Sequence, residues 1–276
     1  MPKLRSHLPH AVTLDPVRAS AGVEAWYRAR LLKLVDAMHK SVAYWVTALY
    51  RDKVDSQLAH DATPATELAK RLKKLGKQWT GTFEAMSATI AKSFVDKAMK
   101  HGDLAFKSAL KKGGFTIEFT TTPAIRATLD AATHENVRLI RSIPAKYLDE
   151  VEGHVLRSVQ AGRAMKELTE TLHEVYGVTK RRAALIARDQ NNKATAHMSR
   201  VRMLGLGITT ALWSHTMASK EPREEHEEWD GEKFDLDEGM YSEVDGENVW
   251  PGTPINCGCT SRAVIPGYND DEEDEK

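Results

Sequence analysis

Apolar residues recur at steps of three and four along most of this chain, and this spacing is the strongest constraint on its fold. The period predicts a first long helix that begins at Val23 and ends near Leu49. The residues on its apolar face are Val23, Tyr27, Leu31, Leu34, Val35, Met38, Val42, Trp45 and Leu49. Because charged residues fall mostly on the other faces, this stripe is interpreted as core.

A second helix begins at Thr63, where a capping residue precedes a proline suited to the first turn. We expect it to bend or break near Gly76 and Gly81 and to reach about His101. Residues 115–122 then alternate β-branched and aromatic residues with others. This stretch predicts either a short strand or an extended crossing.

The helical period returns after Pro123, stops before Pro144 and resumes over residues 147–160. A further helix over residues 165–176 is expected to close at Gly177, because glycine is the usual residue in a left-handed position after a helix.

Thr179 is predicted to cap a last, longer helix that ends at Gly205. Residues 188–190 lie on its inner side, where a buried hydrogen-bonded network is expected. Residues 208–213 have the β-branched and aromatic content of a strand.

The sequence therefore predicts a mainly α protein, with a helical N-terminal body and a small C-terminal α+β module rich in loops. The expected regions are an extended arm (1–20), an N-terminal helical region (21–115), a basic helical body (116–207), a small Trp/His/Cys module with short strands (208–267) and an acidic disordered tail (268–276).

The net charge of zero hides a strong asymmetry. Residues 219–249 hold thirteen Asp or Glu against three Lys or Arg, a net charge of −10, and residues 250–276 add −4, so residues 1–218 carry +14. No run approaches eighteen apolar residues, and the N-terminus has no apolar core typical of a signal peptide. We expect a protein made in the cytoplasm, without a membrane segment.

Positive charge is densest on the last long helix. We expect a contact with DNA backbone or with an acidic partner surface at Lys180, Arg181, Arg182, Lys193, Arg200 and Arg202. The alternative is an ordinary solvated helix face.

The C-terminal module holds both cysteines of the chain and two nearby histidines. His215, His226, Cys257 and Cys259 form a plausible two-His, two-Cys set for a structural zinc ion, because thiolate and imidazole suit zinc and a small module needs a staple. Alternatively, the histidines are hydrogen-bonded turn residues and the thiols are simply packed.

No glycine-rich phosphate loop, nucleophile elbow or His-Glu-x-x-His pair occurs in the sequence. A zinc ion held by four protein ligands has no open position for catalysis. We therefore expect a protein that is not an enzyme; a metal-dependent hydrolase is the less favoured alternative.

An ordered set of motifs marks the C-terminal module and the helices before it. The module reads Trp213-x-His215, Pro222-Arg223-x-x-His226, Asp230-Gly231-x-x-Phe234 and Pro251-Gly252-x-Pro254-x-x-Cys257-x-Cys259. Upstream lie Glu135-Asn136-Val137 with Ile143-Pro144-x-x-Tyr147, and Ala187-Arg188-Asp189-Gln190-x-x-Lys193. Over roughly residues 120–266 this set resembles the phage Mu F-like minor head proteins, the head-morphogenesis family of tailed phages and prophages.

The resemblance implies a structural minor head protein that is present in few copies. It implies a location inside the virion head, near the portal. The implied partners are portal, capsid or scaffold proteins. The implied role is in capsid assembly, with possible DNA packaging or ejection. A sequence-nonspecific accessory protein that binds double-stranded DNA is the alternative. The sequence departs from the family at residues 217–221, Met-Ala-Ser-Lys-Glu, where more glycine is expected.

Overall fold

The computed structural model describes residues 4, 7, 9–53, 63–161, 165–216 and 222–267. The chain divides into two compact units made of separated stretches. Unit 1 comprises Met1–Glu24, Ser93–Ala132 and Arg188–Lys276; unit 2 comprises Ala25–Lys92 and Thr133–Ala187. The predicted fold class, mainly α with a small C-terminal α+β module, is confirmed. The expected acidic tail at 268–276 lies outside the described residues, and the other region boundaries stay predictions.

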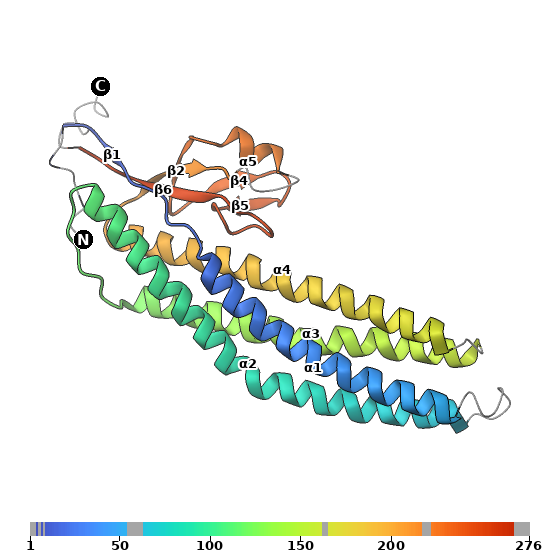
Figure 1. Ribbon diagram of the computed structural model, residues 1–276. Coiled ribbons are helices and arrows are strands. Elements are labelled where there is room, and N and C mark those ends of the chain that lie inside the picture. Colours follow the sequence, from blue (N-terminus) through green and yellow to red (C-terminus); the bar gives the residue numbers. More distant parts are fainter. Residues whose placement is uncertain are drawn as a thin grey trace. The chain divides into compact units, whose positions relative to one another are not determined.

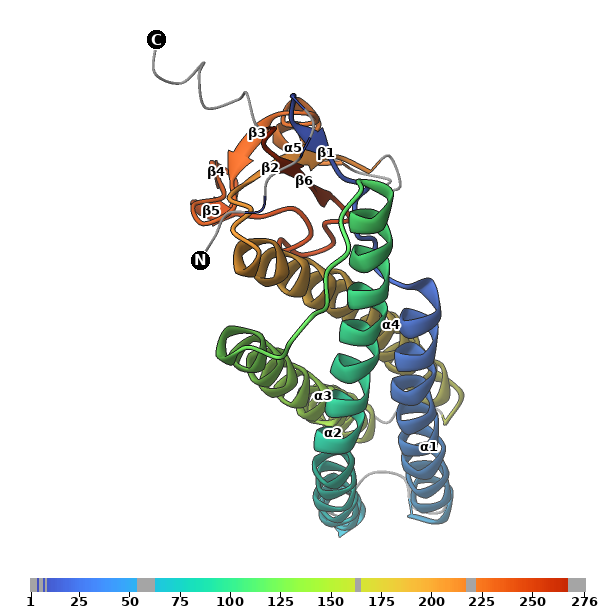
Figure 2. The same ribbon diagram turned by 90° about the vertical axis from the view of Figure 1, so that its left-hand side faces the viewer.

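Four long helices make up most of the chain: α1 (Ala21–Lys53), α2 (Thr63–Lys112), α3 (Pro123–Gln160) and α4 (Met165–Gly205). In unit 2, stretches of all four run side by side in both views (Figure 1, Figure 2). Within the described ranges, none of these helices combines the length and the apolar character needed to cross a bilayer.

The predicted apolar stripe of α1 forms part of the core of unit 2, since Tyr27, Leu31 and Met38 are fully buried. Trp45 differs: 38% of it is exposed, and the Arg71 guanidinium lies 3.4 Å from the centroid of its ring. The ring thus contacts a cation on its face and the Tyr44 ring edge-on.

Polar side chains also join the helices of unit 2. Tyr27 donates a hydrogen bond to Asn136 Oδ1 at 2.8 Å, which links α1 to α3. Arg182 donates to Ser142 Oγ at 2.8 Å, which links α4 to α3. Such bonds fix the helices in register because a buried polar group that lacks its partner is costly.

The predicted break in α2 is wrong. The helix continues through Gly76 and Gly81 and past His101 to Lys112. A glycine inside a helix costs only about 1 kcal/mol. Burial of apolar neighbours such as Leu75 and Phe83 outweighs that cost.

The predicted ends at Pro144 and Gly177 are also wrong. Helix α3 continues through Pro144, between the buried Ile143 and Tyr147. Helix α4 continues through Gly177, and the Thr179 hydroxyl donates back to the Val175 carbonyl at 2.9 Å rather than capping a new helix. In both places, tertiary packing overrides the local preference.

Unit 1 contains an antiparallel sheet in the order β1-β6-β2-β3. These strands are β1 (Val12–Thr13), β6 (Thr260–Ile265), β2 (Thr210–Ser214) and β3 (Lys233–Asp235); a separate pair is formed by β4 (Met240–Ser242) and β5 (Glu247–Val249). The short helix α5 (Glu224–Glu228) lies between β2 and β3 in the sequence. The predicted strand before Trp213 is therefore present as β2, and it pairs with β6 in a register that places Ala211 opposite Ala263.

The core of unit 1 combines the sheet with the ends of two long helices. Trp213 and Ile265 from the strands are buried in one cluster with Phe106 of α2 and Met203 of α4. Residues 115–122, all of them described, are extended without strand pairing, so the second of the two expected alternatives holds.

The N-terminal arm belongs to this sheet. Val12 pairs with Ile265, and the Leu14 N–H donates to the Ala263 carbonyl at 2.9 Å. Leu14 is buried in the core of unit 1. The pairing of Val12 and Thr13 with a strand some 250 residues away left no local signal in the sequence.

Candidate metal centre

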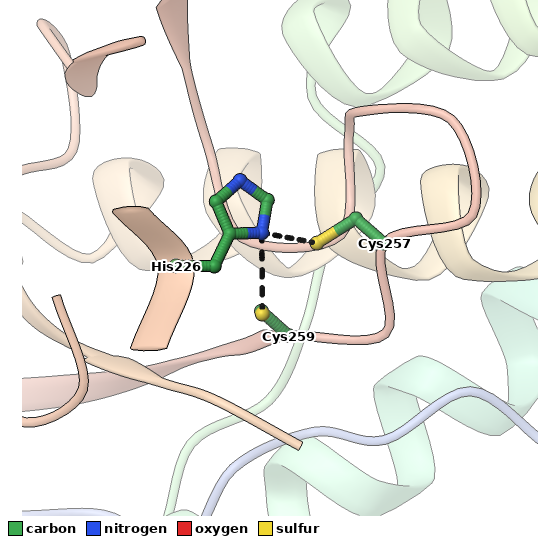
Figure 3. Close-up of side chains that lie close together, drawn as sticks. All are labelled: His226, Cys257 and Cys259. Atoms are coloured by element: carbon green, nitrogen blue, oxygen red, sulfur yellow. Dashed lines mark hydrogen bonds between the residues drawn. The ribbon is translucent and has the colours of Figure 1, made fainter. Parts of the chain in front are cut away.

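Three of the four predicted ligands meet in unit 1. His226 of α5 lies against Cys257 and Cys259, which flank Gly258 just before β6. His226 Nδ1 lies 3.6 Å from Cys257 Sγ and 3.7 Å from Cys259 Sγ, and the three ligand atoms all lie within 4.8 Å of one another. Figure 3 shows the imidazole turned toward both sulfur atoms.

These distances suit a tetrahedral metal. Zinc binds sulfur at about 2.3 Å and imidazole nitrogen at about 2.0–2.1 Å, so two of its tetrahedral ligands lie about 3.6 Å apart. The two nitrogen-to-sulfur distances at His226 match that edge. All three side chains are buried, which keeps water away from a bound ion.

The fourth predicted ligand, His215, lies at the edge of this cluster. It follows β2 directly and is half-buried, with Nδ1 3.5 Å from Cys259 Sγ. Its backbone N–H donates to Asp230 Oδ1 at 2.8 Å, which gives Asp230 of the motif a positioning role. The distance to Cys259 also matches a tetrahedral edge.

Helix α4 holds the loop that carries the cysteines. Asp189 Oδ1 accepts a hydrogen bond from the Asn256 N–H at 2.9 Å, and Asn192 Nδ2 donates to the Cys257 carbonyl at 3.0 Å. Arg188 donates to Asn256 Oδ1 at 2.8 Å. The network expected at residues 188–190 thus includes the buried Asp189, although Arg188 is exposed. Sequence reasoning missed Asn192 and Asn256 as its partners.

Gly252 explains the Pro251-Gly252 motif. Its φ is +84°, and a Cβ built there would lie 3.1 Å from both the Cys259 carbonyl oxygen and the Ala196 Cβ. Its N–H points to Cys257 Sγ at 3.4 Å. The position therefore requires glycine for both conformation and space.

Aromatic rings hold His226 in place. The imidazole stacks on Trp229 at an interplanar angle of 29° and lies 5.0 Å, between ring centroids, from Trp213. Trp213 also packs on Phe234, so the Trp and Phe of the motif form one wall of the site. Because α5 has only 5 residues, this aromatic packing positions the imidazole.

Other motif residues shape the turns around the site. Gly231 has a φ of +87°, and its N–H donates to the Trp213 carbonyl at 2.9 Å. Arg223 Nη1 lies 3.5 Å from Asp245 Oδ2, while Pro222 is exposed.

The two thiols shift each other's pKa in opposite directions. A hydrogen bond from Cys259, helped by His226 and the Gly252 N–H, lowers the pKa of Cys257 to about 4. The same bond and burial raise the pKa of Cys259 well above its ordinary value. Because metal binding requires thiolates, an ion bound here displaces the remaining proton.

The basic residues predicted to contact DNA do not share one open face. Lys193 pairs with Asp189 at 3.2 Å, Arg200 donates to the Asp237 carbonyl at 3.1 Å, and Arg202 pairs with Asp103. Lys180 lies 3.9 Å from Asp36, and Arg182 is bonded to Ser142. Arg181 is exposed. Five of the six residues thus already hold partners within the chain.

Part of the chain matches a known protein family. Residues 149–262 match the family model described as "Phage Mu protein F like protein", so the resemblance expected from the motifs is confirmed. A protein of Haemophilus influenzae, described only as uncharacterized, is 28% identical over 269 residues, which are 95% of this chain. The chain spans 58% of that protein's length. No solved structure matches the chain.

Proposed function

Because residues 149–262 match the phage Mu F-like family, we propose that this chain is a head-morphogenesis protein of a tailed phage or prophage. It acts in the virion head near the portal, with portal, capsid or scaffold proteins as partners. The family match carries this proposal. The role is structural rather than enzymatic, since the candidate ligands serve to fold a small module.

The test is the protein's presence in phage particles. We expect quantitative mass spectrometry of purified procapsids and mature heads to detect the chain at a few copies per particle. A stop codon early in its gene should reduce filled heads, and supply of the chain in trans should restore them. Absence of the chain from both kinds of particle would contradict the proposal.

We further propose that His226, Cys257 and Cys259 hold a structural zinc ion, with His215 as the fourth ligand. The tetrahedral distances and the burial of the three residues support this. In this arrangement zinc contributes folding free energy to a module with few residues of its own to bury. The resemblance also implied a role in DNA delivery. The ion pairs of Lys193 and Arg202 do not favour a DNA-binding surface on α4.

Elemental analysis tests the metal. We expect about one zinc per chain, and Cys257→Ser should lose the zinc together with several degrees of melting temperature. His154→Ala, a substitution of a histidine in unit 2, is the matched control and should keep the zinc. Wild-type protein that purifies without zinc, with full stability in the presence of a chelator, would show that the thiols are only packed.

A further inference from the structure

A cavity of about 1050 Å³ lies within unit 1, beside the metal centre. Its walls come from the segment before α1, one face of α4, the start of α5 and the cysteine loop. Three arginines (Arg18, Arg188 and Arg223) and one carboxylate (Glu24) line it, together with the candidate metal ligands His215, His226, Cys257 and Cys259. The head-assembly role does not account for this cluster.

The positive lining stands out against its surroundings. Residues 219–249, which supply part of the wall, carry a net charge of −10. From local composition alone, the cavity wall would be expected to carry net negative charge. The fold instead adds positively charged side chains to the wall, Arg18 from the arm and Arg188 from α4. A cationic cavity within an acidic stretch favours an anionic group that enters it, and it disfavours a long polyanion such as duplex DNA.

The arginines keep donors free for a ligand. A guanidinium has five N–H donors, and the hydrogen bond from Arg188 to Asn256 Oδ1 uses one of them. Arg18 is exposed in the arm. Arg223 lies 3.5 Å from Asp245, so it already has a carboxylate partner and contributes positive charge rather than free donors. Arg18 and Arg188 are thus the residues that suit paired carboxylate oxygens.

The rest of the lining suits a peptide. The lining includes apolar residues such as Val17, Ala196 and Ile255 and the hydroxyl residues Ser199 and Ser261. The volume lies at the upper end of ligand pockets, which span about 300–1,000 Å³, and far exceeds the size of an inorganic anion. A mixed lining of this size accommodates a short extended segment that carries both apolar and acidic side chains.

We infer that this cavity binds an acidic, extended peptide segment of a partner protein, whose carboxylates pair with Arg18 and Arg188. The inference does not depend on the head-assembly role, because it rests on the lining of the cavity.

Fluorescence anisotropy on the full chain tests this inference. The probe is a fluorescein-labelled peptide of eight residues that alternates glutamate and leucine. We expect saturable binding, with Kd raised on the order of tenfold by Arg18→Gln and by Arg188→Gln, since a charge-assisted bond contributes about that factor. Arg181→Gln, a substitution of an exposed arginine of α4 in the other unit, is the matched control and should change Kd less than about twofold.

Competitors and folding controls separate the outcomes. Circular dichroism verifies that each variant is folded, and Arg18→Gln alone carries the test if Arg188→Gln disturbs the cysteine loop. Equal displacement of the probe by inorganic phosphate, or by an eight-nucleotide oligothymidylate, would overturn the inference in favour of a general anion site. Equal weakening by Arg181→Gln, or no weakening by Arg18→Gln, would overturn it too.

Discussion

At the scale of residues, the cysteine loop depends on one unusual backbone conformation. Asn256 has a φ of +62°, in the left-handed region that non-glycine residues rarely adopt. Asn tolerates this region best among side chains that are not glycine, and here its N–H and Oδ1 bind Asp189 and Arg188. Because Cys257 is the next residue, this conformation directs a candidate metal ligand.

Two substitutions of Asn256 separate the effect of its left-handed backbone conformation from the effect of its hydrogen bond with Arg188. We expect Asn256→Ala to destabilise the protein by about 1–2 kcal/mol, because alanine pays the left-handed cost and loses the Arg188 bond. Asn256→Gly loses the bond alone and should cost less, about 0.5–1 kcal/mol. Urea denaturation measures both. Equal losses for the two variants would contradict a conformational role.

At the scale of elements, α4 organises unit 1. One stretch of it, residues 188–192, holds the cysteine loop, and its last turns hold α2 and the extended segment after α2. The second contact depends on Arg202, a buried residue that makes two 2.9 Å bonds to the Asp103 carboxylate and a 2.6 Å bond to the Thr120 carbonyl. Its guanidinium also lies over Phe119.

Removal of Arg202 should be costly, because Asp103 would keep a partly buried charge without its partner. We expect Arg202→Ala to lower the free energy of unfolding by about 3 kcal/mol. The double substitution Arg202→Met with Asp103→Leu should recover much of that loss, since it removes both charges. Arg181→Ala, at an exposed position on α4, is the control and should change stability by less than about 0.5 kcal/mol. A loss that small for Arg202→Ala, measured by denaturant unfolding, would contradict this role.

At the scale of the whole molecule, the two units have different relations to the family. The matched residues 149–262 include the candidate metal centre and the stretch of α4 that holds it. Of these residues, 149–187 belong to unit 2 and 188–262 belong to unit 1. Helices α1 and α2 lie wholly in the part of the chain that the family model does not cover. The particle test above examines the whole chain, whereas the zinc and peptide tests examine unit 1.

The sequence by itself determined the mainly α fold, the apolar stripe of α1 and the family motifs, because helical period and motif spacing are local. It also predicted His215, His226, Cys257 and Cys259 as a metal-binding set, of which the structure groups the last three most closely. Where it was wrong, at Gly76, Pro144 and Gly177, local costs of about 1–3 kcal/mol were outweighed by packing that no local pattern records.

Only the tertiary structure decided which distant residues meet. It brought Asn256 to Asp189 and the arm to β6, and it paired Lys193 and Arg202 with carboxylates instead of leaving them for DNA. It also placed Arg18 and Arg188 in the lining of one cavity. These contacts join residues far apart in the chain, and the burial of shared apolar surface, not any local preference, holds them together.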